Sequence, residues 1–367
     1  MIISNSGKMN RLKEKIKIAL KIELIFDLIQ GAVVSSLFKL EDLDKVLEKE
    51  DNIIKDNIKI YKLTREEILD NPYLKNINIE EEQIGNMVYS KKRRIRSNIL
   101  SLYSEDVRDP DTYIIKKEYF IPEKVVDLPI LHEKDKTVAL MSIEPHETRT
   151  LSKFINEAYG NVLICGCGLG YTAYMLSLKE NVNSITILEK NEDVIELFNN
   201  QVYKNIKDKE KISIIKCDAN EYLNNNDLSI YDYINVDLWY DTFDMVYPYL
   251  KGLLLEEKYP NTHFTYWLEQ SLLIEIQREL LSYIATGQFV GNVKQVSEVA
   301  KGTILVSHDL INNEESLNKF ISFENIKKNM KEWSINNIDI IENMGRETEK
   351  QQEEYTSMMT KVLNKRI

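Results

Sequence analysis

Residues 161–190 restrict the fold of this chain more than any other segment. The segment begins with an apolar, β-favouring run that is typical of a strand buried on both faces, and a helical pattern and a second strand follow. Between the first strand and the helix lie Gly166, Gly168 and Gly170, and the second strand ends at Glu189. Glycines let a backbone approach a ligand closely, and an acid one strand over can hold ribose hydroxyls. The segment therefore predicts a nucleoside-binding site.

The spacing of the glycines discriminates between cofactors. A dinucleotide-binding turn has the pattern G-x-G-x-x-G, with a small residue at its last position. In this chain that position is Tyr171, and the pattern is G-x-G-x-G. The spacing therefore argues against a dinucleotide. Taken alone, the pattern also fits a strand–helix–strand unit that has a glycine-rich turn and binds nothing.

Further strands and helices alternate as far as about residue 310, which predicts a parallel, doubly wound sheet. Strands are expected at 211–216, 231–237, 262–267 and 302–307, with helices at 146–159, 192–204, 219–223 and 271–284. Ligands of such sheets bind beyond the carboxyl ends of the strands. Glu189, Asp218 and Asp237 follow three consecutive strands. Each acid alone could cap a helix, but three at successive strand ends behind a glycine loop predict a binding site.

The rest of the chain suggests three further parts. Residues 1–110 are predicted to be a mainly helical domain, with Thr64 as a helix N-cap and a helix end at Asn71-Pro72. Residues 111–145 predict a small β element, such as a hairpin of strands 113–121 and 137–143. Residues 146–310 form the expected Rossmann-like domain, and 311–367 a helical C-terminal extension.

Charge and cysteine content limit the partners and the compartment. The net charge is -11, which argues against a dedicated nucleic-acid binder. The basic run at 91–96 is interpreted as a solvated helix face, because no aromatic residues interleave it. Three cysteines, Cys165, Cys167 and Cys217, form no disulfide framework and lack metal-ligand spacing, so a reducing cytoplasm and no metal are expected.

No signal peptide or membrane span is evident in the sequence. The most apolar early run, residues 23–40, contains Glu23, Asp27 and Lys39, whose charges are costly in lipid. It is interpreted as a buried helix or a helix pair broken near Gly31. No membrane partner is therefore expected, and a homodimer is left open.

The G-x-G-x-G loop resembles motif I of the class I S-adenosylmethionine (SAM) dependent methyltransferases. The resemblance covers about residues 145–310 and implies SAM as the cofactor. It places Gly166, Gly168 and Gly170 along the methionine part and Glu189 on the ribose. It also implies that Asp218 and the backbone N–H of Ala219 contact adenine, and that Asp237 lies by the methionine end or the acceptor.

Two narrower resemblances accompany it. Residues 188–198 (LEKNEDVIELF) and 231–241 (YDYINVDLWYD) are similar to spermidine synthases, which transfer an aminopropyl group from decarboxylated SAM. Asp241 is the nearest match to the catalytic acid of that family, although the family's proline-containing loop and its Gly-Gly-Gly-Asp-Gly form are absent. The loop and the run from Met141 to Glu147 also resemble bacterial methyltransferase-like proteins of unknown substrate.

Methyl transfer needs a base only if the acceptor must lose a proton. The candidates are Asp237, Asp241 and Tyr240, with His146 and Glu147 as further possibilities. Trp239 and Tyr240 either line an acceptor pocket or pack against the N-terminal domain. No Asn/Asp-Pro-Pro-Tyr/Phe motif follows the fourth strand, which argues against amino-methylation of DNA. The predicted activity is methyl transfer to a small molecule or a protein. The alternatives are aminopropyl or aminocarboxypropyl transfer, and a non-enzymatic binding protein on the same fold.

Overall fold

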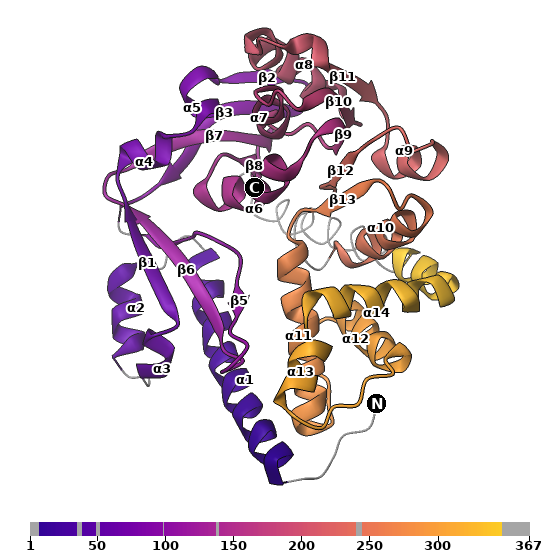
Figure 1. Cartoon of the computed structure of the whole chain (residues 1–367). Helices are drawn as coiled ribbons and strands as arrows, with labels where there is room; N and C mark the ends of the chain where they lie inside the picture. Colours follow the sequence, from indigo (N-terminus) through magenta and orange to yellow (C-terminus); the bar gives the residue numbers. More distant parts are fainter. Residues whose placement is uncertain are drawn as a thin grey trace, which may run out of the picture. The chain divides into compact units, whose positions relative to one another are not determined.

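The structure is a computed structural model that describes residues 7–34, 39–48, 52–97, 99–136, 139–239 and 244–346 (Figure 1). The chain divides into two compact units. We call Ile18–Leu238 with Tyr259–Glu269 the sheet unit, and Met1–Lys17, Trp239–Lys258 and Gln270–Ile367 the helical unit. The domain boundaries predicted at residues 110, 145 and 310 stay predictions.

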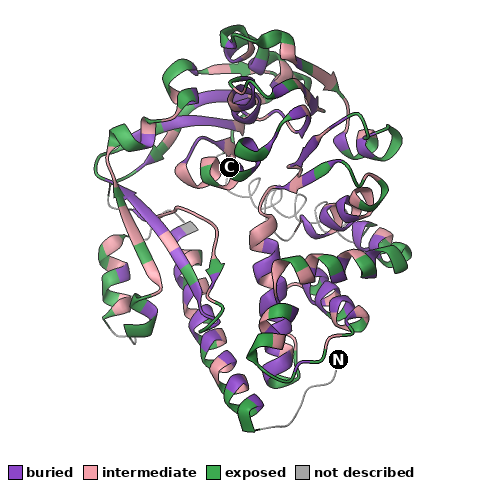
Figure 2. Ribbon diagram, in the orientation of Figure 1, coloured by how far each residue is buried: buried purple, intermediate pink, exposed green. Residues whose placement is uncertain are grey.

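A five-stranded parallel sheet forms the centre of the sheet unit, in the order β11-β10-β9-β12-β13. Its strands are β9 (Gly160–Cys165), β10 (Val182–Glu189), β11 (Ile212–Lys216), β12 (Tyr233–Val236) and β13 (His263–Tyr266). β9, β10 and β12 are largely buried, as their apolar sequences predict (Figure 2). Five of the six strands expected from the sequence for this sheet are confirmed, and with them a mixed α/β fold.

Helix α6 (Pro145–Glu157) precedes β9 in the chain. Between β9 and β12 come α7 (Tyr171–Ser177), α8 (Glu192–Gln201) and α9 (Ala219–Asn225), with short 3-10 turns at Tyr203–Asn205 and Lys209–Lys211. α8 and α9 start where the sequence places them because Asn191 and Asp218 accept hydrogen bonds from the N–H groups of their first turns. The predicted helices of this region are confirmed.

The region before α6 contains two further sheets. An antiparallel sheet has the order β2-β3-β7-β8, with β2 (Glu82–Ile84), β3 (Met87–Ile95), β7 (Val126–Glu133) and β8 (Ala139–Ser142). In the other, β6 (Ile115–Pro122) pairs with β1 (Ile58–Leu63), β4 (Ser101–Leu102) and β5 (Val107–Arg108). The mainly helical prediction for residues 1–110 is therefore wrong over β1 to β5.

Two local predictions in this region are also corrected. The basic run at 91–96 does not lie on a helix, because residues 91–95 belong to β3 and most of them pair with β7. Strands 113–121 and 137–143 do not form a hairpin together. β6 pairs with β1, while β8 pairs with β7, a strand that lies between the two predicted ones in the sequence.

Three helices precede β1 in the chain: α1 (Gly7–Val34), α2 (Leu40–Leu47) and α3 (Asn52–Lys55). Two short helices, α4 (Arg65–Leu69) and α5 (Pro72–Asn76), lie between β1 and β2. α1 continues through Gly31, so the predicted break there is wrong. Thr64 caps α4 with Glu67 in a capping box, as predicted. α4 ends at Leu69, and Asn71-Pro72 starts α5.

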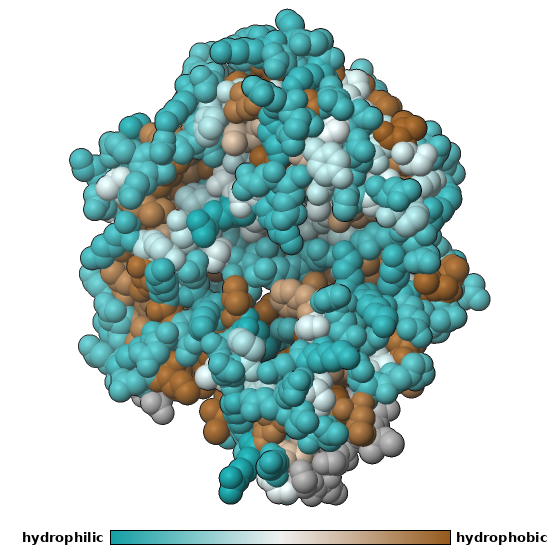
Figure 3. Space-filling view, viewed as in Figure 1, coloured by the Kyte–Doolittle hydropathy of each residue, from teal (hydrophilic) through white to brown (hydrophobic). Residues whose placement is uncertain are grey.

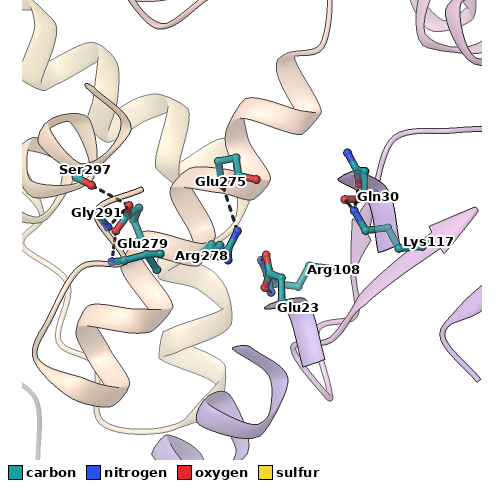
Figure 4. Close-up of polar contacts among 11 residues, drawn as sticks. Glu23, Gln30, Arg108, Lys117, Glu275, Arg278, Glu279, Gly291 and Ser297 are labelled. Atoms are coloured by element: carbon teal, nitrogen blue, oxygen red, sulfur yellow. Dashed lines mark hydrogen bonds and ion pairs between the residues drawn. The ribbon is translucent and has the colours of Figure 1, made fainter. Parts of the chain in front are cut away.

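A buried ion pair ties α1 to β5 within the sheet unit. Arg108 donates from both terminal nitrogens to Glu23, at 2.9 and 3.1 Å, and also bonds the carbonyl of Tyr113 (Figure 4). About two turns further along α1, the side chain of Gln30 accepts a hydrogen bond from Lys117 of β6. The ion pair explains how an apolar helix can carry Glu23, because Arg108 satisfies its carboxylate away from water.

The helical unit contains α10 (Val246–Lys258), most of α11 (Glu269–Thr286), α12 (Lys294–Val306), α13 (Glu314–Phe320), α14 (Phe323–Asn336) and helical residues 338–346. The strand predicted at 302–307 is wrong, because α12 covers all but its last residue. Gly302 faces the ring of Trp333, so α12 and α14 approach closely there. Glu279 accepts hydrogen bonds from Val290, Gly291 and Ser297 (Figure 4).

In the described part of the chain, every helix is too short or too polar to span a bilayer. The face of the molecule in Figure 3 is mostly hydrophilic, and its hydrophobic residues form small separate patches.

Candidate functional site

The strand register brings the predicted site residues to one edge of the parallel sheet. Glu189, at the end of β10, pairs with Lys216, the last residue of β11. Asp218 follows two residues later, so it lies at the same edge of the sheet. Cys165, at the end of β9, pairs with Val236, so Gly166 and Asp237 are neighbours. The carboxyl edge therefore runs from Asp218 to Glu189, the glycine loop and Asp237, so these residues lie along one edge of the sheet.

The glycine loop, defined as residues 166–170, is bonded directly to Glu189. The backbone N–H of Cys167 donates to Oε2 of Glu189 at 3.0 Å, and the N–H of Asn191 donates to Oε1 at 2.8 Å. The N–H of Gly166 bonds the carbonyl of Leu188 at 2.8 Å. These bonds orient the partly exposed Glu189 carboxylate at the loop.

Glycine is required at position 166 for two reasons. Its φ is 101°, a conformation that residues with a side chain rarely adopt. A Cβ there would also lie 3.2 Å from the backbone oxygen of Asp237. The loop thus passes β12 at backbone-to-backbone distance, which is the close approach expected of a ligand-binding glycine loop.

Asp218 caps α9. Its Oδ1 accepts from the N–H groups of Asn220 and Glu221, at 2.8 and 3.3 Å. Asp218 therefore does cap a helix, which was the alternative interpretation of each acid in the sequence. Its Oδ2 takes no part in these bonds, so the cap and a ligand contact are compatible. Ala219 is buried at the start of the helix, and the adenine contacts of both residues stay predictions.

Asp237 and Glu147 are weak acids in this fold. Burial raises the pKa of Asp237 to about 7. Burial likewise raises the pKa of Glu147 to about 8, and the nearby charges of Glu144 and Asp237 act in the same direction. The N–H of Ser142 bonds Glu147 at 2.9 Å and partly opposes that shift. Carboxyls with pKa values near neutrality can exchange protons with a bound molecule.

His146 differs from these acids. Burial lowers its pKa to about 4, so its ring is neutral at physiological pH. The structure places it in the first turn of α6, beside Glu147 in the sequence. It brings no charge to the edge of the sheet.

Two of the predicted catalytic residues, Tyr240 and Asp241, lie outside the described residues. Trp239 is described and is buried. Its assignment to an acceptor pocket stays a prediction, as does any role of Tyr240 and Asp241.

Sequence reasoning missed Trp267, which follows β13 directly. Its indole N–H donates to Oγ1 of Thr150 at 3.0 Å, and its backbone N–H bonds the carbonyl of Val236 at 3.1 Å. Trp267 therefore links α6 to the end of β12, next to Asp237. The expected strand 262–267 included Trp267, whereas β13 ends at Tyr266, and this difference of one residue hid Trp267 from the rule applied to the other strand ends.

The basic run on β3 is neutralised by its surroundings. Lys92 pairs with Glu81 at 2.6 Å, Arg93 with Glu144, and Arg94 with Asp127 at 2.8 and 3.2 Å. Lys91 bonds the side chain of Asn78. Most of the positive charge of the run thus already has a protein partner. The described residues contain no group of three or more His, Cys, Asp and Glu side chains arranged to hold a metal ion.

Comparison with known proteins finds similar chains only among solved structures. No protein-family description and no curated protein matches the chain. Among solved structures it is similar to a Trypanosoma brucei PRMT1 enzyme–prozyme heterotetramer with AdoHcy, at 15% identity and a TM-score of 0.23. The match covers 32% of this chain and 36% of that chain, about a third of each. A likeness of this extent does not establish a shared fold.

Proposed function

We propose that this protein is a SAM-dependent methyltransferase acting on a small-molecule or protein acceptor. The observation that carries the proposal is the hydrogen bond from the glycine loop to Glu189 at the carboxyl edge of the parallel sheet. A nucleoside bound at that edge would meet a backbone without side chains and a carboxylate fixed beside it. A doubly wound arrangement of helices about the sheet belongs to the same proposal.

Each residue of the edge then has a physical role. Glu189 would accept two hydrogen bonds from the ribose diol, Asp218 would accept from the adenine amino group, and the N–H of Ala219 would face the ring. Gly166, Gly168 and Gly170 would pass under the methionine part. Asp237, adjacent to Gly166, would balance a positive charge of the cofactor when ionised.

SAM supplies the transferable methyl group, and the protein holds the acceptor in line with it and excludes water. Asp237 and Glu147 have pKa values of about 7 and 8, so either can take a proton from an acceptor that must lose one. Tyr240 and Asp241 remain proposed participants on sequence grounds alone. A cytoplasmic location and a homodimer are part of the proposal in the same way.

The test is calorimetric titration of the full chain with S-adenosylhomocysteine. Wild-type protein should bind with a dissociation constant in the micromolar range, and Glu189→Ala should weaken binding at least about 30-fold, because two hydrogen bonds to a charged group are lost. Glu180→Ala is the matched control, since Glu180 is exposed just before the opposite end of β10. Equal affinities for all three proteins would overturn the ribose assignment.

A parallel thermal-shift experiment separates the two transferase chemistries. SAM and decarboxylated SAM are added separately, each with and without putrescine. A larger stabilisation by SAM supports methyl transfer. A larger stabilisation by decarboxylated SAM with putrescine would favour aminopropyl transfer, and no shift with either would favour a non-enzymatic role.

A further inference from the structure

Three side chains of the antiparallel sheet lie in one row across its strands. Tyr89 of β3 pairs with Leu131 of β7, and Leu131 pairs with Met141 of β8. Directly opposed residues of neighbouring strands point to the same face of a sheet. Tyr89 and Leu131 belong to the hydrophobic core that also contains Leu169 of the glycine loop, and the partly buried Met141 packs against this core. This row therefore faces the loop.

Two members of the row bond the loop backbone. The hydroxyl of Tyr89 donates to the carbonyl of Gly168 at 2.6 Å. The N–H of Leu169 donates to the sulfur of Met141 at 3.1 Å. The sulfur also occupies the place that a Cβ on Gly168 would take, so the loop and β8 are in close contact.

A third contact comes from α5. The hydroxyl of Tyr73 donates to the carbonyl of Leu169 at 2.5 Å. Its ring meets those of Tyr171 and Tyr174 of α7 edge-on, with both centroid distances 5.6 Å. Tyr73 and Tyr89 are fully buried, and burial raises the pKa of both phenols well above its usual range, so both hydroxyls stay protonated and donate.

Most N–H and carbonyl groups of the loop backbone have a hydrogen-bond partner. The N–H groups of Gly166, Cys167, Leu169 and Gly170 all have acceptors, and the carbonyls of Gly168 and Leu169 have the two phenols. Within the described residues, the N–H of Gly168 is the one loop donor without an acceptor. Three of these bonds come from the part of the chain that precedes the parallel sheet, so that part contributes to the shape of the glycine loop.

We propose that Tyr73, Tyr89 and Met141 form a clasp that holds the glycine loop in its ligand-binding conformation. They are positioning residues: they bond the loop backbone from the side of the antiparallel sheet and α5. The inference rests on the proposed function for the identity of the ligand, S-adenosylhomocysteine. The clasp itself rests on the contacts and can be tested without ligand.

The test uses Tyr73→Phe, Tyr89→Phe and the double variant in the full-length protein. Tyr119→Phe is the matched control, because Tyr119 is equally buried in the sheet unit and its hydroxyl has no partner among the described residues. Hydrogen–deuterium exchange followed by mass spectrometry reports on the loop, and calorimetry reports on binding. Thermal melts identify any variant that fails to fold. Met141→Leu is then used in place of that variant, because leucine keeps the apolar volume and removes only the sulfur acceptor.

Each clasp variant should exchange the loop amides about three- to tenfold faster, and the double variant more, while peptides from β9 and β10 keep their protection. Affinity for S-adenosylhomocysteine should fall by a similar factor, and Tyr119→Phe should change neither. Unchanged loop exchange in the double variant would overturn the clasp. Faster exchange with unchanged affinity would overturn its role in binding. If wild-type protein binds no ligand, the proposed function fails, and loop exchange alone decides on the clasp.

Discussion

Gly166 lies against the backbone carbonyl of Asp237: an added Cβ would be 3.2 Å from that oxygen, a crowded contact that would require the neighbouring backbone to shift. The end of β9 and the end of β12 thus meet directly. The loop proposed to carry the cofactor and the acid proposed to act beside it are neighbours in space, although 71 residues separate them in the sequence.

Substituting Gly166 should damage both stability and binding. We expect Gly166→Ala to destabilise the protein by about 2–3 kcal/mol, from its positive φ and from crowding against Asp237. Gly287→Ala is the control, because φ there is 81° and the space around it is open. It should cost about 1 kcal/mol, from backbone strain alone. Urea denaturation measures both, and equal losses would contradict the close approach.

Stability should depend on pH through Asp237. Its ordinary pKa is 3.8, and its pKa in the fold is about 7. Between these values the unfolded chain loses the proton that the folded chain keeps, so the free energy of unfolding falls as pH rises, by at most about 4 kcal/mol. Asp237→Asn should flatten this decline, leaving the part due to Glu147. Asp208→Asn, at an exposed position, should leave it unchanged. A decline as steep in Asp237→Asn as in wild type would contradict the buried acid.

The Glu23–Arg108 pair should be costly to break. Glu23→Ala leaves a buried guanidinium without its carboxylate, and we expect a loss of about 3–5 kcal/mol. Asp127→Ala removes the partner of the exposed Arg94 and should cost less than about 1 kcal/mol. Guanidinium titrations compare the two variants. Similar small losses for both would show that the Glu23–Arg108 pair is open to water.

The basic run on β3 should not bind nucleic acid. Because Glu81, Glu144 and Asp127 pair with three of its cations, little free positive charge is left for phosphates. Fluorescence anisotropy with a labelled single-stranded RNA should show no binding below about 10 μM at 50 mM salt, a condition that strengthens phosphate contacts. Tight binding that Arg94→Glu abolishes would reverse this interpretation.

The glycine loop and its acids could be predicted because the information is local. Gly166 and Glu189 belong to one strand–helix–strand segment, in which turn chemistry and strand period are visible in the sequence. The 302–307 segment shows the opposite case. Its β-favouring residues lie in α12, where close packing of Gly302 on Trp333 overrides a weak propensity.

Long-range pairing explains the other errors. The residues at 91–96 carry five charges and suggested an exposed helix, but Arg93 and Arg94 pair with β7 in a strand. Acids distant in the sequence bind three of the charges. The clasp escaped prediction for the same reason. Tyr73 and Tyr89 are 96 and 79 residues away from the carbonyls that they bond, and no local pattern indicates such a contact.

The most direct test of the central claim is a crystal structure of the protein soaked with S-adenosylhomocysteine. The account predicts ribose hydroxyls within hydrogen-bond distance of Glu189 and adenine beside Asp218, with the glycine loop under the homocysteine part. A nucleoside bound elsewhere, or a Glu189 carboxylate that contacts only Cys167 and Asn191 at saturating ligand, would contradict it.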